Sequence, residues 1–160
     1  MKDPIRMLRQ KIEEAKATQD ANTLTALYKQ YEDAELPPHL MVDKARAIQL
    51  SDGHEYQLES AEEILQMALE NDPGCLEAYV ELGYFYYAVN DDPAWAIKVF
   101  DCGMSRAKAF ATELALGKAK ALFELDQIEA ALEIVNDPSF KNEQGFERLR
   151  EEIVEKNHPI

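Results

Sequence analysis

Residues 79–86 read YVELGYFY, and within them Tyr79, Leu82, Gly83 and Tyr86 recur at intervals of three and four. This spacing puts all four residues on one face of an α-helix. A glycine on that face allows the backbone of a second helix to approach closely, to about 8–10 Å between axes. The stretch therefore predicts a helix that packs tightly against a partner helix along this face.

A pattern of small and large residues recurs along the chain with a period of 34 or 35 residues. A shift of 34 places Leu24, Leu27, Tyr31 and Ala34 onto Leu58, Ala61, Leu65 and Ala68. Shifts of 35 place Ala61, Leu65 and Ala68 onto Ala96, Phe100 and Gly103, and then Ala96 and Phe100 onto Ala131 and Val135. Alternate helices share this pattern, so the repeating unit is a helical hairpin. One hairpin cannot bury its apolar face alone, and this favours a stack of neighbouring hairpins.

Proline, glycine and Asn-Asp clusters divide the chain into about nine expected helices. The signals NDP at 71–73, NDDP at 90–93 and NDP at 136–138 each end one helix and begin the next. No segment shows the two-residue alternation typical of strands. The first helix is expected to begin at Pro4, and the others to span about 22–37, 40–50, 55–70, 74–89, 93–108, 111–125, 127–135 and 140–156.

These patterns resemble the tetratricopeptide repeat family, whose hairpin reads Trp-x2-Leu-Gly-x2-Tyr, then Ala-x3-Phe-x2-Ala, then Pro. Residues 79–86 match its first half with Tyr79 in place of Trp, and Ala61-x3-Leu65-x2-Ala68 with Pro73 matches its second half. The third repeat is weaker, because Leu116-Gly117 offers a competing register. The resemblance implies an all-α superhelical stack in a single domain over residues 1–160. Its parts would be an N-terminal helical pair in 1–38, three repeats in 40–138 and a C-terminal capping helix in 140–156.

A second stripe on the helix at 74–89 consists of Val80, Tyr84 and Tyr87. The resemblance implies that this face lines a concave groove, although the tyrosines could instead contact the terminal helices. The other groove residues implied by the same register are Arg46 and Leu50 from the preceding hairpin and Leu116, Lys120 and Phe123 from the following one. Some members of the family clamp an acidic C-terminus with Lys, Arg and Asn. Leu50 and Tyr84 occupy the Asn positions here, so we expect no such clamp.

The 160 residues include 17 basic and 31 acidic side chains, a net charge of −14. Residues 1–30 hold six basic and four acidic side chains (+2), whereas residues 31–97 hold two basic and fifteen acidic ones (−13). This balance argues against nucleic acid as a partner. The acidic segment is either a solvated surface or a surface for a basic partner. No apolar run is long enough for a membrane span or a signal peptide, and two cysteines are too few for a disulfide scaffold, so we expect a cytoplasmic protein.

The sequence contains none of the common nucleotide-binding, hydrolase or metalloprotease motifs. His39, His54 and His158 lie near helix breaks or the C-terminus, without a matched nucleophile. Cys75 begins a helix, where a thiolate could be stabilised, but we expect a small buried residue there. We therefore expect no catalytic residue, cofactor or metal. The expected function is a protein-interaction module that binds a peptide or helical segment in an aromatic groove.

The alternative is a dedicated acidic binder of one basic client, such as a toxin-neutralising immunity protein or a secretion chaperone. In either case the partner is another protein of basic and apolar character, because apolar anchors fit an aromatic groove and basic flanks fit its acidic surroundings. Neither nucleic acid nor membrane is expected as a partner.

Overall fold

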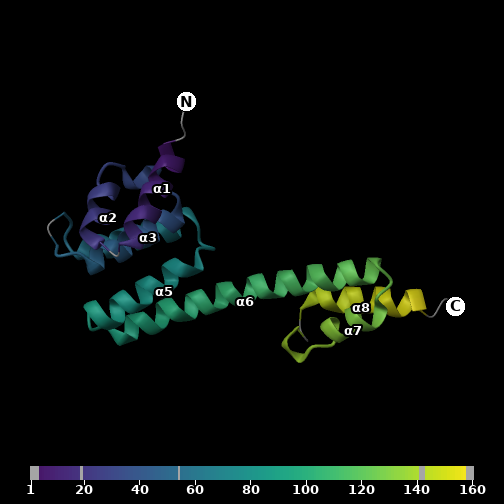
Figure 1. The fold of residues 1–160 in the computed structure, drawn as a ribbon. Coiled ribbons are helices and arrows are strands. Elements are labelled where there is room, and N and C mark those ends of the chain that lie inside the picture. The colour runs from purple at the N-terminus through teal and green to yellow at the C-terminus, as the bar shows by residue number, and fades with distance from the viewer. Residues whose placement is uncertain (1–3, 19, 54, 141–142, 158–160) are drawn as a thin grey trace. The chain divides into compact units, whose positions relative to one another are not determined.

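The computed structural model describes residues 4–18, 20–53, 55–140 and 143–157, and within these ranges it is helical without any strand (Figure 1). The all-α prediction is thereby confirmed. The α-helices are α1 (Pro4–Ala17), α2 (Ala21–Tyr28), α3 (Pro38–Leu50), α4 (Glu59–Asn71), α5 (Leu76–Tyr84), α6 (Pro93–Glu124), α7 (Ile128–Val135) and α8 (Gln144–Asn157). Short 3₁₀ turns cover Asp33–Glu35 (η1) and Pro138–Phe140 (η3), and a π-helix covers Phe85–Val89 (η2).

Contacts along the chain group the helices into two compact units, Met1–Met104 and Ser105–Ile160. Each unit has its own cluster of buried apolar side chains. The boundary lies within α6, so the first part of that helix belongs to the first unit and the remainder to the second. The expectation of one superhelical domain over residues 1–160 stays a prediction.

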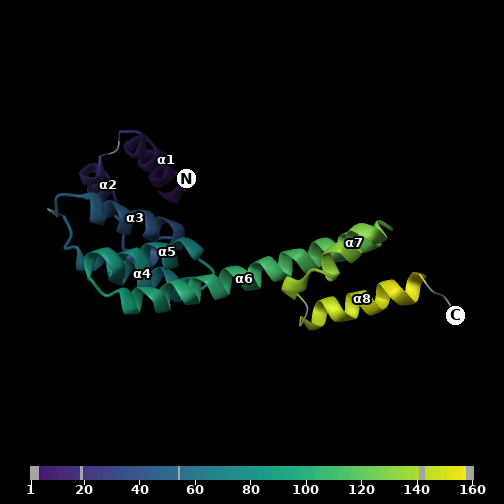
Figure 2. The same ribbon diagram turned by 90° about the horizontal axis from the view of Figure 1, so that it is seen from below.

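In the first unit each helix packs against the next along the chain, from α1 through α5, and α3 also contacts α5 (Figure 2). Local signals start two of these helices. Asp20 caps α2 by accepting a hydrogen bond from the Thr23 backbone N–H at 3.0 Å, and Pro38 occupies the first position of α3. The largest wholly buried apolar side chains of this unit are Leu8, Ile12, Tyr28, Met41, Val42, Leu65 and Phe85.

The tight pairing expected around Gly83 is confirmed where α5 meets the start of α6. A Cβ atom on Gly83 would lie 2.6 Å from Cζ and 2.8 Å from Cδ1 of Phe100. Across the same contact, a Cβ atom on Gly103 would lie 2.8 Å from Cβ of Tyr79. Both glycines therefore provide the space in which an aromatic side chain of the facing helix lies.

The helix expected over 74–89 is α-helical only from Leu76 to Tyr84, and its last five residues form a π-helix. The Asn90 backbone N–H donates to the Phe85 carbonyl at 3.1 Å, which is the five-residue step of that helix type. Phe85 and Tyr86 are both buried. The Tyr86 hydroxyl donates to Glu62 of α4 at 2.5 Å, so the π-helical turn is bonded to the neighbouring helix.

The predicted break between helices 93–108 and 111–125 is wrong, because α6 runs without interruption from Pro93 to Glu124. The described residues therefore contain eight α-helices instead of about nine. Pro73 follows the second helix of the preceding hairpin, but Lys108 occupies the corresponding position here. Residues 105–112 contain neither glycine nor proline, so nothing in the local sequence ends the helix.

Three other expected helices have different bounds, and the one expected over 55–70 begins only at Glu59. Helix α2 ends at Tyr28 rather than near residue 37, and Ala34 lies exposed in the 3₁₀ turn η1. Pro37 disfavours helical geometry at Leu36, which is extended and buried. The capping helix expected from residue 140 begins at Gln144, because Pro138 to Phe140 form a separate 3₁₀ turn.

In the second unit, α7 packs against α8, and apolar residues from the end of α6 complete the core. The rings of Phe140 and Phe146 are stacked with centroids 4.5 Å apart. Arg150 of α8 donates to the Val135 carbonyl and to Asn136 Oδ1, and so satisfies acceptors at the C-terminal end of α7. Six buried side chains form this core: Ala119, Ala131, Val135, Phe146, Leu149 and Ile153.

Candidate functional site

Helix α5 and the π-helix after it leave four large apolar side chains in contact with solvent. The exposed fractions are 44% for Val80, 58% for Tyr84, 59% for Tyr87 and 39% for Val89, the last residue of the π-helix. Leu76 and Tyr79 are half-buried, and the residues that face the core are Ala78, Leu82, Gly83, Phe85 and Tyr86. We call Val80, Tyr84 and Tyr87 the α5 apolar face. The sequence periodicity had grouped these same residues as a second stripe.

One edge of this face is held in place by a core aromatic residue. The Tyr84 and Phe100 rings meet edge to face, with centroids 5.4 Å apart and planes at 77°. Phe100 in turn occupies the space beside Gly83. Tyr84 is therefore packed on one side and open on the other. A tyrosine held in this way offers a large contact area with little rotational freedom left to lose on binding.

Two carboxylates lie on the same side of α5 as this face, since Glu77 and Glu81 precede Val80 and Tyr84 by three residues each. Glu81 is paired with α3, because the Arg46 Nε donates to its Oε1 at 2.7 Å. Arg46 also lies 3.4 Å from Asp43, so two carboxylates surround its guanidinium group. Arg46 thus joins α3 to α5.

Leu50, the last residue of α3, is 78% exposed. The remaining predicted groove residues, Leu116, Lys120 and Phe123, lie in the second unit. Leu116 is half-buried, and a Cβ atom on Gly145 of α8 would lie 2.6 Å from its Cδ2. Phe123 is half-buried beneath Lys156, whose Nζ lies 4.8 Å from the ring centre, and Lys120 is exposed. Within that unit, Leu116 and Phe123 therefore pack against α8.

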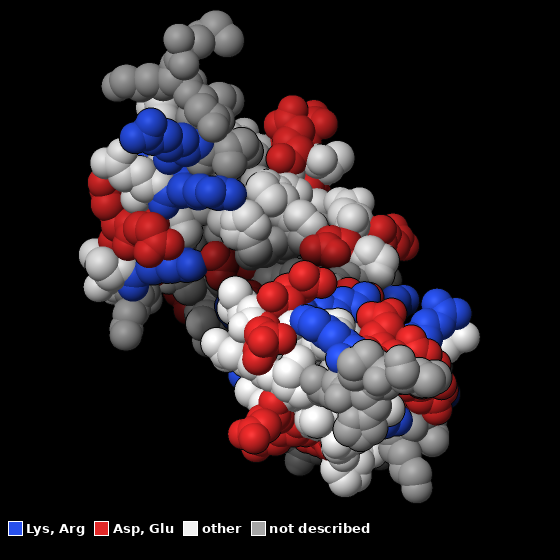
Figure 3. All heavy atoms as spheres, turned by 90° about the vertical axis from the view of Figure 1, so that its right-hand side faces the viewer, with Lys and Arg blue, Asp and Glu red and all other residues white. Residues whose placement is uncertain are grey.

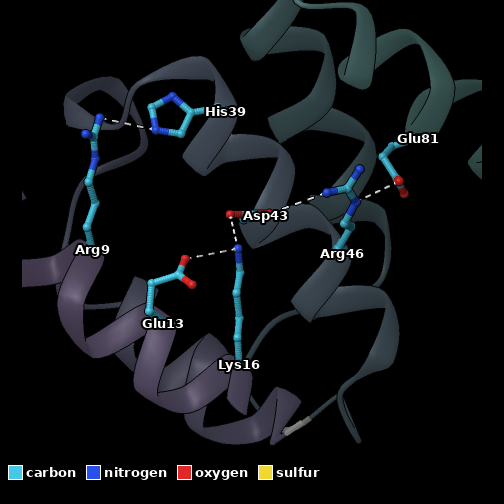
Figure 4. A network of polar contacts seen from close by, with 7 residues as sticks. All are labelled: Arg9, Glu13, Lys16, His39, Asp43, Arg46 and Glu81. Atoms are coloured by element: carbon cyan, nitrogen blue, oxygen red, sulfur yellow. Dashed lines mark hydrogen bonds and ion pairs between the residues drawn. The ribbon is translucent and has the colours of Figure 1, made fainter. Parts of the chain in front are cut away.

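A charged cluster that the sequence analysis missed joins α1 to α3 (Figure 4). Lys16 Nζ lies 2.7 Å from Asp43 Oδ2 and 3.8 Å from Glu13 Oε1. Arg9 Nη2 lies 3.3 Å from His39 Nε2. The sequence contained one signal for this pairing, because its first 30 residues carry a net positive charge and are followed by a strongly acidic segment. The individual partners are 27 and 30 residues apart in sequence, so their identity depends on how the helices pack.

This cluster borders a pocket of about 510 Å³ in the first unit. Its lining comes from α1, α3 and the first turn of α5: Arg9, Glu13, Lys16, His39, Leu40, Asp43, Arg46 and Glu77.

The Tyr28 hydroxyl is wholly buried without a hydrogen-bond partner among the described residues. Burial raises the pKa of Tyr28, and the negative charges of Asp43 and Glu13 raise it further. Tyr28 is therefore a neutral phenol.

The described residues contain no group of three or more His, Cys, Asp or Glu side chains placed to hold a metal ion. Burial raises the pKa of Cys75, with smaller contributions from Asp72 and Glu77, so its thiolate is disfavoured despite its position at the start of α5. His54 and His158 lie outside the described residues.

Acidic and basic side chains alternate over the face of the molecule drawn in Figure 3. The acidic excess noted in the sequence is therefore mixed with basic groups on this face. Among the helices that the structure describes, none combines the length and apolar character needed to cross a bilayer.

Comparisons with family models, curated proteins and solved structures gave no significant match for this chain.

Proposed function

We propose that this protein is a non-enzymatic interaction module of tetratricopeptide type that binds a peptide or helical segment of another protein on the α5 apolar face. The repeat spacing, the helical fold and the close α5–α6 contact at Gly83 support the family assignment. In that arrangement Arg46 and Leu50 extend the binding surface onto α3.

The observation that carries this proposal is the exposure of two tyrosines in a helical segment that buries Leu82, Phe85 and Tyr86 on its core side. Tyr84 and Tyr87 each expose more than half of their surface. Tyrosine is enriched at interface hot spots because it combines apolar area with a polar tip. The face is also pre-positioned, since Tyr84 contacts Phe100 and Arg46 ties α5 to α3.

The test is affinity capture from the native source with three forms of the chain. These are the unaltered chain, Tyr84→Ala with Tyr87→Ala, and a control with Ile97→Ala and Met104→Ala. The control residues lie on α6 in the same unit and are 60% and 69% exposed. We expect a partner that the unaltered chain and the control retain and the tyrosine variant loses. Equal retention by all three forms would remove the α5 apolar face from the proposal.

The alternative role, a dedicated binder of one basic client, is favoured by Glu77, an exposed carboxylate on the same side of α5 as the tyrosines, whereas Glu81 is already paired with Arg46. A basic flank of the bound segment would lie beside Glu77, and its cation could stack on a tyrosine ring. Such a complex should weaken steeply as salt rises above about 0.15 M. Binding that is insensitive to salt would contradict the electrostatic role and would be consistent with apolar contacts alone.

A further inference from the structure

We propose that the pocket between α1 and α3 binds an anionic oxygen group, a carboxylate or a phosphate, through Arg9 and His39. Both side chains are exposed at the pocket and reach it from different helices (Figure 4). The pocket adjoins the surface proposed above, since Arg46 and Glu77 border both, but Arg9 and His39 lie outside that surface and their role does not depend on the function proposed for it.

The charges around the pocket differ in whether they are already paired. Lys16 is paired with Asp43 and Glu13. Arg46 is paired with Glu81 and Asp43. Arg9 forms no ion pair within the described part of the chain, and its guanidinium Nη2 lies 3.3 Å from Nε2 of His39. Arg9 is therefore the pocket cation whose charge has no carboxylate to balance it.

The chemistry of this pair suits an oxygen anion. A guanidinium group has five N–H donors in a planar fork, and one contact with His39 leaves the others available for two parallel hydrogen bonds to a carboxylate or phosphate. Because the Arg9 guanidinium can only donate, His39 Nε2 is the acceptor in this contact, and the neutral ring carries its hydrogen on Nδ1, which is a donor available to an anion. His39 lies in the first turn of α3, which contains no acidic side chain, so the positive end of that helix is not already neutralised.

The carboxylates that line the pocket are engaged by its other cations, including Glu13, which lies one helical turn after Arg9 on α1. Glu13 and Asp43 face Lys16, and Glu77 contributes to the charge around Arg46. An anion bound at Arg9 and His39 would thus complete a set of ion pairs, because each of the three pocket cations would then have an anionic partner.

The test measures binding of inorganic phosphate and of acetate to the full chain by NMR, with chloride keeping the ionic strength constant. The ring signals of His39 are assigned by their loss in His39→Gln. We expect these signals to shift saturably, and we expect Arg9→Gln to weaken the affinity by about tenfold, as for loss of a charge-assisted hydrogen bond. Saturation by phosphate alone identifies a phosphate site, and saturation by both anions identifies a general oxyanion site.

The matched control is Lys11→Gln, which removes an exposed cation from α1 two residues away, on another side of the helix. It should leave the affinity unchanged. The proposal is overturned if neither anion gives a saturable shift, or if Lys11→Gln weakens binding as much as Arg9→Gln. Circular dichroism of each variant shows that the helices remain folded. The outcome at Tyr84 and Tyr87 has no bearing on this result.

Discussion

The side chain of Phe100 on α6 lies directly over Gly83 of α5, so that a Cβ atom at this glycine would be within 2.8 Å of ring atom Cδ1. Phe100 also supports Tyr84 through an edge-to-face contact. The packing at Gly83 and the placement of the exposed tyrosine therefore depend on the same aromatic ring.

Replacement of Gly83 by Leu should lower the free energy of unfolding by about 1–3 kcal/mol, because the larger side chain must displace Phe100. Urea denaturation measures this change. Gly117→Ala is the matched control, since a Cβ atom at that helical glycine meets nothing within 4 Å. The control should raise stability by about 1 kcal/mol through helix propensity. An unchanged midpoint for Gly83→Leu would contradict the close contact.

Replacement of Tyr28 by Phe should leave stability unchanged or raise it by about 1 kcal/mol. The Tyr28 hydroxyl is buried without a hydrogen-bond partner among the described residues, so its removal relieves an uncompensated desolvation cost. The phenyl ring keeps the packing of α2 against the core. The free energy of unfolding in urea tests this expectation. A loss of more than about 1 kcal/mol would show that the hydroxyl is hydrogen-bonded in solution.

Removing Lys44 and removing Asp33 from their ion pair should lower the free energy of unfolding by unequal amounts. Lys44 is 2% exposed, its Nζ lies 2.5 Å from Asp33 Oδ1, and it also stacks over the Tyr56 ring. Asp33→Asn leaves a buried cation unpaired and should cost about 3 kcal/mol. Lys44→Met fills a similar volume and leaves Asp33, whose side chain is 32% exposed, accessible to water. We expect the smaller loss for Lys44→Met, and the reverse order in denaturation curves would refute this assignment.

The two cysteines should differ in reactivity. Cys102 is exposed, whereas Cys75 is half-buried and its pKa is raised by that burial. A raised pKa means less thiolate at a given pH, so iodoacetamide should modify Cys102 first and Cys75 only as the pH rises further. Mass spectrometry of the two peptides over a time course measures both rates. Faster labelling of Cys75 near neutral pH would mean that its thiolate is stabilised at the start of α5.

Sequence periodicity predicted the local features of the fold well where apolar residues recur over several turns. The buried Ala61, Leu65 and Ala68 of α4 and the close contact at Gly83 both follow from such spacing. The break expected near residue 109 has no basis in the local sequence. Because Lys108 stands where a proline would be needed, α6 continues through it.

The two candidate sites were predictable to different degrees, because sequence periodicity encodes which residues share a helix face but not which helices meet. Tyr84 and Tyr87 lie on a stripe beside the one that carries Leu82 and Gly83, and the packing of that neighbouring stripe leaves them at the surface. The pairing of Arg9 with His39 joins helices that are 30 residues apart, and no periodicity encodes it. Likewise, the ion pair of Lys44 with Asp33, which ties the turn after α2 to α3, is a tertiary contact that no periodicity encodes.

The central claim is that Tyr84 and Tyr87 bind a partner protein, and the most direct measurement is the affinity of a purified captured partner for the unaltered chain and for Tyr84→Ala with Tyr87→Ala. Each exposed tyrosine at the centre of an interface is worth about 1–2 kcal/mol or more. We therefore predict that the dissociation constant rises at least about tenfold while the far-UV circular dichroism is unchanged. An equal dissociation constant for the two forms would contradict the claim.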